Sequence, residues 1–258
     1  MPRGPGGRER GDWFRGALPR VIAHRGLALH HTENTIGAFR AALEAGATHL
    51  ETDAHATRDG IAVLAHDADL SRITGDGRTI ASVTFAELRG IARGGADFCT
   101  LIDALQTFPS ALFNLDVKAA TATAPVARAI REAGAQKRVL IASFRSARRR
   151  AVIRGLGAVP TSASSEQLLL AILGMRLRLP AVTAFALRRV DAVQIPRSVL
   201  GFSTTTPRAI DAFHRAGVEV HVWTINEPAE IEELLQLGVD GIVSDRCDVV
   251  AAVVSRLR

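Results

Sequence analysis

The sequence is poor in cysteine and in aromatic residues, and each of these shortages excludes a class of protein. Two cysteines in 258 residues cannot build a disulfide scaffold. Tyrosine is absent, and aromatic residues make up only 5% of the chain. The net charge of +6 therefore comes without a basic stripe that carries interleaved aromatic residues, so we expect no nucleic-acid partner. The hydrophobic content of 47% is that of an ordinary globular domain.

The chain also lacks a targeting signal and a membrane span. Its first 20 residues are charged and contain no apolar core, so they do not form a secretory signal. No apolar run approaches the roughly 20 residues that a spanning helix needs. These absences predict a cytoplasmic protein. We expect residues 1–19 to form a flexible basic leader, partly docked through Trp13 and Phe14, and residues 20–258 to form a single domain.

The most apolar stretch, residues 168–187, has two interpretations. It is broken by arginines and by Pro180, which favours a helix of the domain followed by a loop. The alternative is an interfacial patch that contacts lipid and makes the protein peripheral to the inner face of the membrane. In that case the nearby basic side chains would face lipid head groups: Arg176, Arg178, Arg188 and Arg189.

Short β-branched runs alternate with amphipathic stretches along the rest of the chain, which predicts a parallel α/β sheet. Eight such units in this length favour a single closed (β/α)8 TIM barrel. A doubly wound open sheet is the alternative, but it usually has a glycine-rich turn after the first strand, where only Gly26 stands. The predicted strands are 21–24, 49–53, 112–117, 139–143, 159–163, 192–195, 218–224 and 241–244.

One segment interrupts this alternation. Asp59-Gly60 is a strong two-residue hairpin signal between two apolar runs. We therefore expect the second strand to continue beyond the barrel rim and fold back as a β-hairpin extension. This arrangement would place His66 above the carboxyl-terminal mouth of the barrel, where active sites of this fold lie.

Three carboxylates are predicted to meet at that mouth. Glu51 and Asp53 are two residues apart and so point to one side of the second strand, and Asp116 lies at the same height on the next strand. Their mutual repulsion and desolvation are costly. Each one alone is most simply explained by a salt bridge to an arginine, but all three together favour a hard divalent cation, Mg²⁺ or Ca²⁺.

Other polar residues near the same mouth suit catalysis on a phosphate. Because imidazole titrates near neutral pH, His24 and His66 are candidates for a general acid and a general base. Lys118 is one of only two lysines and follows Asp116 by two positions, and Arg25 follows His24; both could bind an oxyanion or phosphate. The other six histidines are interpreted as structural. Trp223 either packs the top of the barrel or forms an apolar wall of the substrate pocket.

The ordered set of motifs resembles the glycerophosphodiester phosphodiesterase family from about residue 21 to residue 248. The segments that carry the resemblance are His24-Arg25-Gly26, Glu33-Asn34-Thr35, Glu51-Thr52-Asp53, Asp59-Gly60, His66-Asp67, Asn114-Leu115-Asp116-Val117-Lys118, Trp223-Thr224-Ile225-Asn226 and Gly238-Val239-Asp240-Gly241. Two positions depart from the family: Thr32 stands where proline is usual, and Asp116 stands where glutamate is usual. The shorter carboxylate leaves the preferred metal open.

The resemblance implies a metal-dependent barrel enzyme that hydrolyses glycerophosphodiesters to glycerol 3-phosphate and an alcohol. It implies metal ligation by Glu51, Asp53 and Asp116, acid–base catalysis by His24 and His66, and phosphate contact by Arg25 and Lys118. Two alternatives stay open: a lysophospholipase D-like hydrolase that acts on lysolipids, and a non-enzymatic barrel that binds phosphate-containing polymers. The sequence leaves open the alcohol, the oligomeric state, which histidine is the base, and whether a cyclic phosphate forms.

Overall fold

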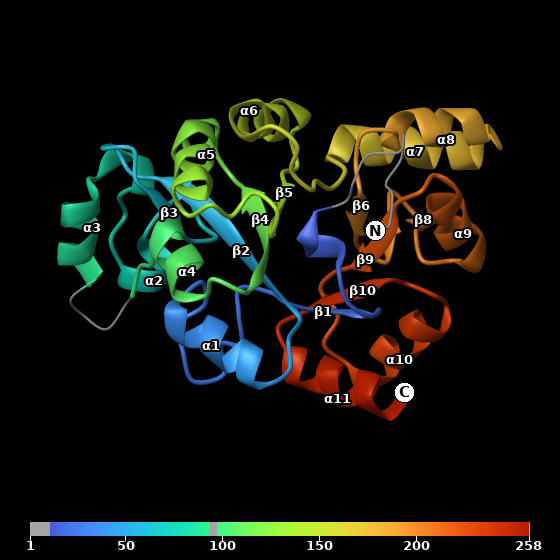
Figure 1. The fold of residues 1–258 in the computed structure, drawn as a ribbon, viewed down its shortest axis with the longest axis horizontal. Coiled ribbons are helices and arrows are strands. Elements are labelled where there is room, and N and C mark those ends of the chain that lie inside the picture. The colour runs from blue at the N-terminus through green and yellow to red at the C-terminus, as the bar shows by residue number, and fades with distance from the viewer. Residues whose placement is uncertain (1–10, 93–96, 258) are drawn as a thin grey trace.

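The strands of the protein surround a central axis, and most of the helices lie outside them (Figure 1). The computed structural model describes residues 11–92 and 97–257. Its strands are β1 (Arg20–Ala23), β2 (His49–Ala56), β3 (Ala62–Leu64), β4 (Leu112–Val117), β5 (Val139–Ala142), β6 (Ala192–Ile195), β7 (Ser198–Val199), β8 (Phe202–Ser203), β9 (Glu219–Val222) and β10 (Gly241–Ser244).

The α-helices follow the strands in the alternation that the sequence predicts. They are α1 (Ile36–Glu44), α2 (Ser71–Thr74), α3 (Phe85–Ile91), α4 (Leu101–Thr107), α5 (Thr123–Glu132), α6 (Ser146–Leu156), α7 (Ser165–Arg176), α8 (Pro180–Leu187), α9 (Pro207–Arg215), α10 (Pro228–Gln236) and α11 (Cys247–Leu257). No helix within the described parts of the chain combines the length and the apolar character that crossing a membrane requires.

Parallel pairing confirms the predicted barrel. The main sheet runs in the order β5-β4-β2-β1-β10-β9-β6. Its two ends are joined through residues 161–162, because Thr161 bridges Ile141 of β5 and Ser162 bridges Ala192 of β6, both in parallel. These residues take the place of the strand predicted at 159–163. Only bridges form there, and Pro160 in that segment has no N–H to donate to a ladder.

The helices begin and end where the local sequence allows. The Thr35 side chain accepts a hydrogen bond from the backbone N–H of Ala38 and so caps α1. Pro207 and Pro228 occupy the first turns of α9 and α10, where a missing N–H is tolerated. Gly46 follows α1 with a φ of 94°, a conformation that side chains disfavour. Thr35, Pro207 and Pro228 therefore mark where helices begin, and Gly46 marks where α1 ends.

The second strand of the barrel is longer than its neighbours. Beyond the rim, β2 pairs antiparallel with β3, with Ala54 opposite Leu64 and Ala56 opposite Ala62. Within the turn between them, the Thr57 hydroxyl donates to the Asp59 carboxylate at 2.6 Å. After β3 the chain returns to the mouth of the barrel, where the N–H of Ala65 donates to the carbonyl of Asp53. This return positions His66.

The opposite end of the barrel is filled by a segment that precedes β1. Residues Asp12–Phe14 form a short 3₁₀ helix, and Trp13 and Phe14 are buried. The Trp13 indole N–H donates to the carbonyl of Phe113 at 2.9 Å. These two aromatic residues belong to the segment predicted as a leader, whose residues 1–10 lie outside the described part of the chain.

His49, an ionisable side chain from a barrel strand, lies against this base. His49 of β2 stacks against the Trp13 ring at 4.2 Å between centroids and donates from Nε2 to the Trp13 carbonyl at 2.9 Å. Burial lowers the pKa of the His49 imidazole to about 3. The folded protein therefore holds a neutral histidine against Trp13, a state that the unfolded chain keeps only above its ordinary pKa of 6.5.

This burial predicts acid sensitivity. Below pH 6.5 the unfolded chain binds a proton at His49, whereas the folded chain binds it only near pH 3. The free energy of unfolding therefore decreases as the pH falls through this window. Between pH 6 and pH 4 the free energy of unfolding should fall less steeply in a His49→Gln variant than in wild type. The difference in slope should be up to about 1 kcal/mol per pH unit. Urea unfolding at each pH measures this slope. A His30→Gln control at an exposed site should keep the wild-type slope, and equal slopes in all three proteins would contradict the prediction.

Candidate active site

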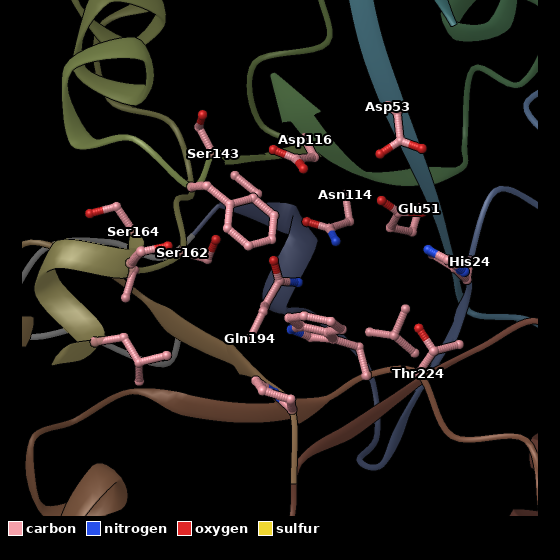
Figure 2. A pocket seen from close by; sticks show the side chains of 18 of the residues that line it. His24, Glu51, Asp53, Asn114, Asp116, Ser143, Ser162, Ser164, Gln194 and Thr224 are labelled. Carbon is pink, nitrogen blue, oxygen red and sulfur yellow. The ribbon is translucent and has the colours of Figure 1, made fainter. Parts of the chain in front are cut away.

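A cavity of about 510 Å³ lies at the carboxyl-terminal ends of the barrel strands. One side of it is polar, with acidic and basic groups from β1, β2 and β4. The opposite side comes mainly from the segments after β5, β6 and β9, and its apolar side chains stand beside several polar ones, such as Ser143, Ser164 and Gln194. Figure 2 shows the labelled side chains of Glu51, Asp53, Asn114 and Asp116 gathered on the polar side, with His24 beside Glu51. The cavity therefore joins a charged half to an apolar half.

Strand register brings the predicted carboxylates together. In the pairing of β2 with β4, Asp53 lies directly opposite Asp116, and Glu51 lies opposite Asn114. Glu51, Asp53 and Asp116 are all buried. Since like charges meet across neighbouring strands in a poorly solvated place, positive charge has to be supplied nearby.

Lys118 supplies part of that charge. Its ammonium lies 2.8 Å from Oδ1 of Asp53 and 2.8 Å from Oδ2 of Asp116, so it bridges the two carboxylates. Burial alone lowers the pKa of Lys118, but the charges of Asp53 and Asp116 outweigh burial and raise it. The lysine is therefore a fixed cation in the cavity wall.

Glu51 is left with less compensation than its neighbours. Burial and the nearby charge of Asp53 raise the pKa of the Glu51 carboxyl to about 8. Two further oxygens in this region, Oδ1 of Asn114 and Oδ1 of Asp116, are buried and have no hydrogen-bond partner. Buried acceptors and an under-compensated carboxylate form a set of hard oxygen donors that suits a divalent cation.

The donor set is not arranged as a finished metal centre. Within residues 11–92 and 97–257, no three His, Cys, Asp or Glu side chains converge closely enough to hold an ion. The position between Asp53 and Asp116 is taken by the Lys118 ammonium. The residues present therefore fit a cation by their chemistry and charge, and Lys118 occupies part of the space between them.

Arg25 is held by carboxylates on several sides. Its Nε lies 3.2 Å from Asp53 as an ion pair that is not aligned as a hydrogen bond, and its terminal NH1 donates to Glu33. Its backbone N–H donates to Glu51 at 3.0 Å. The residue has a φ of 58°, an uncommon conformation for a non-glycine residue, and its carbonyl accepts from the N–H of Asn34. Arg25 thus ties the first loop to both metal-candidate carboxylates of β2.

His24 is oriented by a residue from the far end of the chain. Its Nδ1 lies 2.7 Å from Oδ1 of Asp245, and Asp245 in turn accepts a hydrogen bond from Asn226. Burial lowers the pKa of His24, but the hydrogen bond to Asp245 and the charge of Glu51 outweigh burial and raise it. The sequence does not predict this contact, because Asp245 and His24 lie at opposite ends of the chain.

His66 is oriented in a similar way, through a chain of charges. Its Nδ1 lies 2.8 Å from the carboxylate of the next residue, Asp67. Asp67 pairs with Arg72, and Arg72 pairs with Glu33, which also binds Arg25. This relay links the two histidine-bearing loops. Glu33 and Asp67 belong to the motifs that carry the family resemblance, but the sequence predicts no role for them or for Arg72.

The remaining histidines lie elsewhere, and one of them supports His66. His55 donates a hydrogen bond from Nε2 to the His66 carbonyl at 3.2 Å, so it contacts the backbone of the site and not the polar cavity. His49 and His221 are buried in the barrel base next to Trp13. His30 and His31 are exposed on the first loop, and His214 pairs with Asp240.

Trp223 lies on the apolar side of the cavity. It packs against the buried cluster that includes Trp13, Ile22 and Val243, and it also lines the cavity. Its ring meets that of Phe144 edge to face at 6.3 Å, and Lys118 Nζ lies 5.8 Å from the Phe144 centroid. Phe144 therefore stands where the charged and apolar halves of the cavity meet.

An α/β barrel with acidic and imidazole side chains around one mouth defines the class of the protein as a barrel enzyme. The model of the glycerophosphoryl diester phosphodiesterase family matches residues 24–249. The Mycobacterium tuberculosis protein named "Probable glycerophosphodiester phosphodiesterase 2" is 37% identical over 246 residues, which cover 94% of this chain and 93% of that protein.

Two further similarities bear on the fold and on the range of relatives. Lysophospholipase D GDPD1 of Mus musculus is 27% identical over 88% of this chain and 83% of its own. The crystal structure of a glycerophosphodiester phosphodiesterase from Agrobacterium tumefaciens superposes with a TM-score of 0.75 at 23% identity and covers 92% of this chain and 100% of that one. The chain belongs to the glycerophosphoryl diester phosphodiesterase family, and it is a phosphodiester hydrolase that acts on glycerophosphodiesters.

Proposed function

We propose that this enzyme cleaves glycerophosphodiesters to glycerol 3-phosphate and an alcohol by acid–base catalysis between His24 and His66, with a divalent cation on the neighbouring carboxylates. The observation that carries the proposal is the pair of imidazoles, each oriented through Nδ1 by a carboxylate, on the loops that follow β1 and β3. The phosphate would lie between these imidazoles and the polar wall of the cavity. Membership of an enzyme family sets aside the non-enzymatic alternative.

The cation would be held by Glu51, Asp53 and Asp116, whose oxygens are of the type that Mg²⁺ and Ca²⁺ prefer. The raised pKa of Glu51 and the unpartnered Oδ1 of Asp116 support this assignment. When bound, such an ion supplies Lewis-acid neutralisation of the phosphate charge. It would also take over the charge balance that Lys118 now provides, which leaves the Lys118 ammonium and Arg25 to bind phosphate oxygens.

The two histidines would divide the proton transfers. One imidazole accepts the proton of the attacking oxygen, and the other donates a proton to the leaving alcohol. The attacking oxygen is water or a hydroxyl of the substrate glycerol, and the second route gives a cyclic phosphate first. Asp245 and Asp67 hold the two rings in place through Nδ1, so that Nε2 is the nitrogen left for the proton transfer.

A second substrate class is favoured by the apolar half of the cavity. Its wall includes the large apolar side chains of Phe144, Leu168, Leu169 and Leu200, which stand beside several serines. Such a wall suits an acyl chain, and one relative carries the name lysophospholipase D. Comparing turnover of glycerophosphocholine with that of a lysophosphatidylcholine, at concentrations below micelle formation, separates the two substrates.

Replacing either imidazole should abolish most of the activity without unfolding the protein. For His24→Ala and for His66→Ala we expect turnover of glycerophosphocholine to fall about 10²- to 10⁴-fold, the usual contribution of a general acid or base. Both side chains lie at the rim of the cavity, so urea unfolding should stay close to wild type. A His31→Ala control, at an exposed position of the same loop as His24, should retain full activity. Wild-type turnover in either site variant would refute the acid–base assignment.

The contact from Asp245 should matter for turnover more than for substrate affinity. An Asp245→Asn variant keeps the size of the side chain but loses the charge that orients His24, so we expect kcat to fall at least roughly ten-fold while KM changes little. Steady-state kinetics on a soluble diester measures the split. As a control, Asp211→Asn on the outer surface of α9 should leave both constants unchanged. A rise in KM alone would contradict a positioning role for Asp245.

Removal of divalent ions should also stop the reaction. Treatment with EDTA followed by separate addition of Mg²⁺, Ca²⁺ and Mn²⁺ should abolish and then restore turnover, and isothermal titration of the stripped protein should detect binding of the restoring ion. Asp116→Asn should weaken that binding, because it removes one of the three carboxylate charges. Full activity in EDTA with no measurable ion binding would refute the metal assignment.

A further inference from the structure

The pair of helices α7 and α8 exposes large apolar side chains that the barrel does not use. Figure 1 shows the two helices together on the outside of the molecule, at its upper right. Leu173 is 50% exposed, Leu177 58% and Phe185 57%. We call the whole group the α7–α8 face; its large apolar members are Leu169, Leu170, Leu173, Leu177, Leu179 and Phe185.

The inner contacts of this helix pair are already complete without these residues. Ala171, Ile172, Ala186 and Leu187 are buried beneath it. The helices are joined by the Thr183 hydroxyl, which donates to the Ala171 carbonyl. The outer leucines and Phe185 therefore keep a large part of their apolar surface in water, which is unfavourable. A contiguous exposed apolar patch of this kind marks an interaction surface.

The charges around the face have a single sign. Arginines at 176, 178, 188 and 189 are all exposed, and within the described residues none of them has a carboxylate partner. Between residues 165 and 190 the only acidic residue is Glu166. The guanidinium of Arg188 stacks over the exposed Phe185 ring at 3.9 Å, which keeps charge and apolar surface side by side.

The α7–α8 face is continuous with the mouth of the active site. Leu168 and Leu169 of α7 line the cavity, and Leu169 also belongs to the face. Leu200, in the turn between β7 and β8, lines the cavity as well and is 84% exposed. An apolar path therefore leads from the outer surface of α7 into the cavity.

We propose that the α7–α8 face docks on an anionic lipid bilayer, with its leucines and Phe185 in the interfacial layer and its arginines on the head groups. Arginine beside leucine and phenylalanine is the composition that binds such interfaces. A second copy of this chain is a poorer occupant, because a twofold contact would bring the same unpaired arginines against each other. Docking requires neither the metal nor the histidines, so it stands independently of the proposed mechanism.

Docking also gives the apolar path a use. A diester that carries an acyl chain would leave the bilayer next to Leu169 and enter the cavity past Leu168, without crossing water. A small water-soluble diester would need no such path. The position of the face therefore favours lipid-borne substrates that are presented at the bilayer surface.

Co-sedimentation with vesicles tests the proposal on the full chain. Vesicles of phosphatidylcholine with one third phosphatidylglycerol should pellet the protein at low salt, and pure phosphatidylcholine vesicles should pellet at least ten-fold less. Leu173→Asp/Leu177→Asp and, separately, Arg176→Glu/Arg178→Glu should each reduce the bound fraction at least ten-fold. The matched control is Leu257→Asp, a similarly exposed leucine on α11, and it should bind as wild type does.

Three outcomes would overturn the proposal. They are no binding to anionic vesicles, equal binding by all variants, and a concentration-dependent dimer in sedimentation that the leucine variants abolish, which would make the face an interface between copies of this chain. Hydrolysis of soluble glycerophosphocholine should be unchanged in every variant of the face. Loss of that activity in the leucine variant alone would indicate misfolding, and the arginine variant then decides the question.

Discussion

The site depends on like charges that strand pairing forces together. Because β2 and β4 run in parallel register, Asp53 and Asp116 are opposed on adjacent strands, with Glu51 one pleat below. The barrel cannot separate them without losing its ladder. Lys118 forms ion pairs with Asp53 and Asp116. Glu51 has less positive charge beside it, and its pKa is correspondingly raised. An acidic cluster that the protein itself only partly neutralises is suited to recruit a cation, and a bound cation would offset the negative charge of a phosphodiester.

Much of this arrangement could be predicted from the sequence because it follows from local rules. Residues two apart on a strand share a face, and the carboxyl ends of parallel strands meet at one rim, so Glu51, Asp53, Asp116 and Lys118 were placed together without any structure. The same rules gave the barrel, since each apolar run is separated from the next by a helix with recognisable ends. The turn at residues 59–60 has a chemistry that points to a hairpin by itself.

Other features arise only from contacts between distant segments. Asp245 reaches His24 because β1 pairs with β10, and no spacing within either segment reveals this partner. The relay from His66 to Arg25 passes through side chains of two loops and of helix α2. The second helix of the α7–α8 pair was expected as a loop, since Pro180 was interpreted as an end and not as the start of a new helix.

The aromatic residues below the barrel have a consequence for where the domain starts. Trp13 hydrogen-bonds to β4 and stacks on His49 of β2, while Arg20 of β1 holds the carbonyl of Phe14. These contacts make Asp12–Phe14 a cap over the end of the barrel opposite the cavity, although a stretch of loop separates it from β1. In a chain that began at β1, this end of the barrel would be uncovered, and the inward-facing side chains of several strands would be exposed to water. The physical domain thus begins before its sheet does.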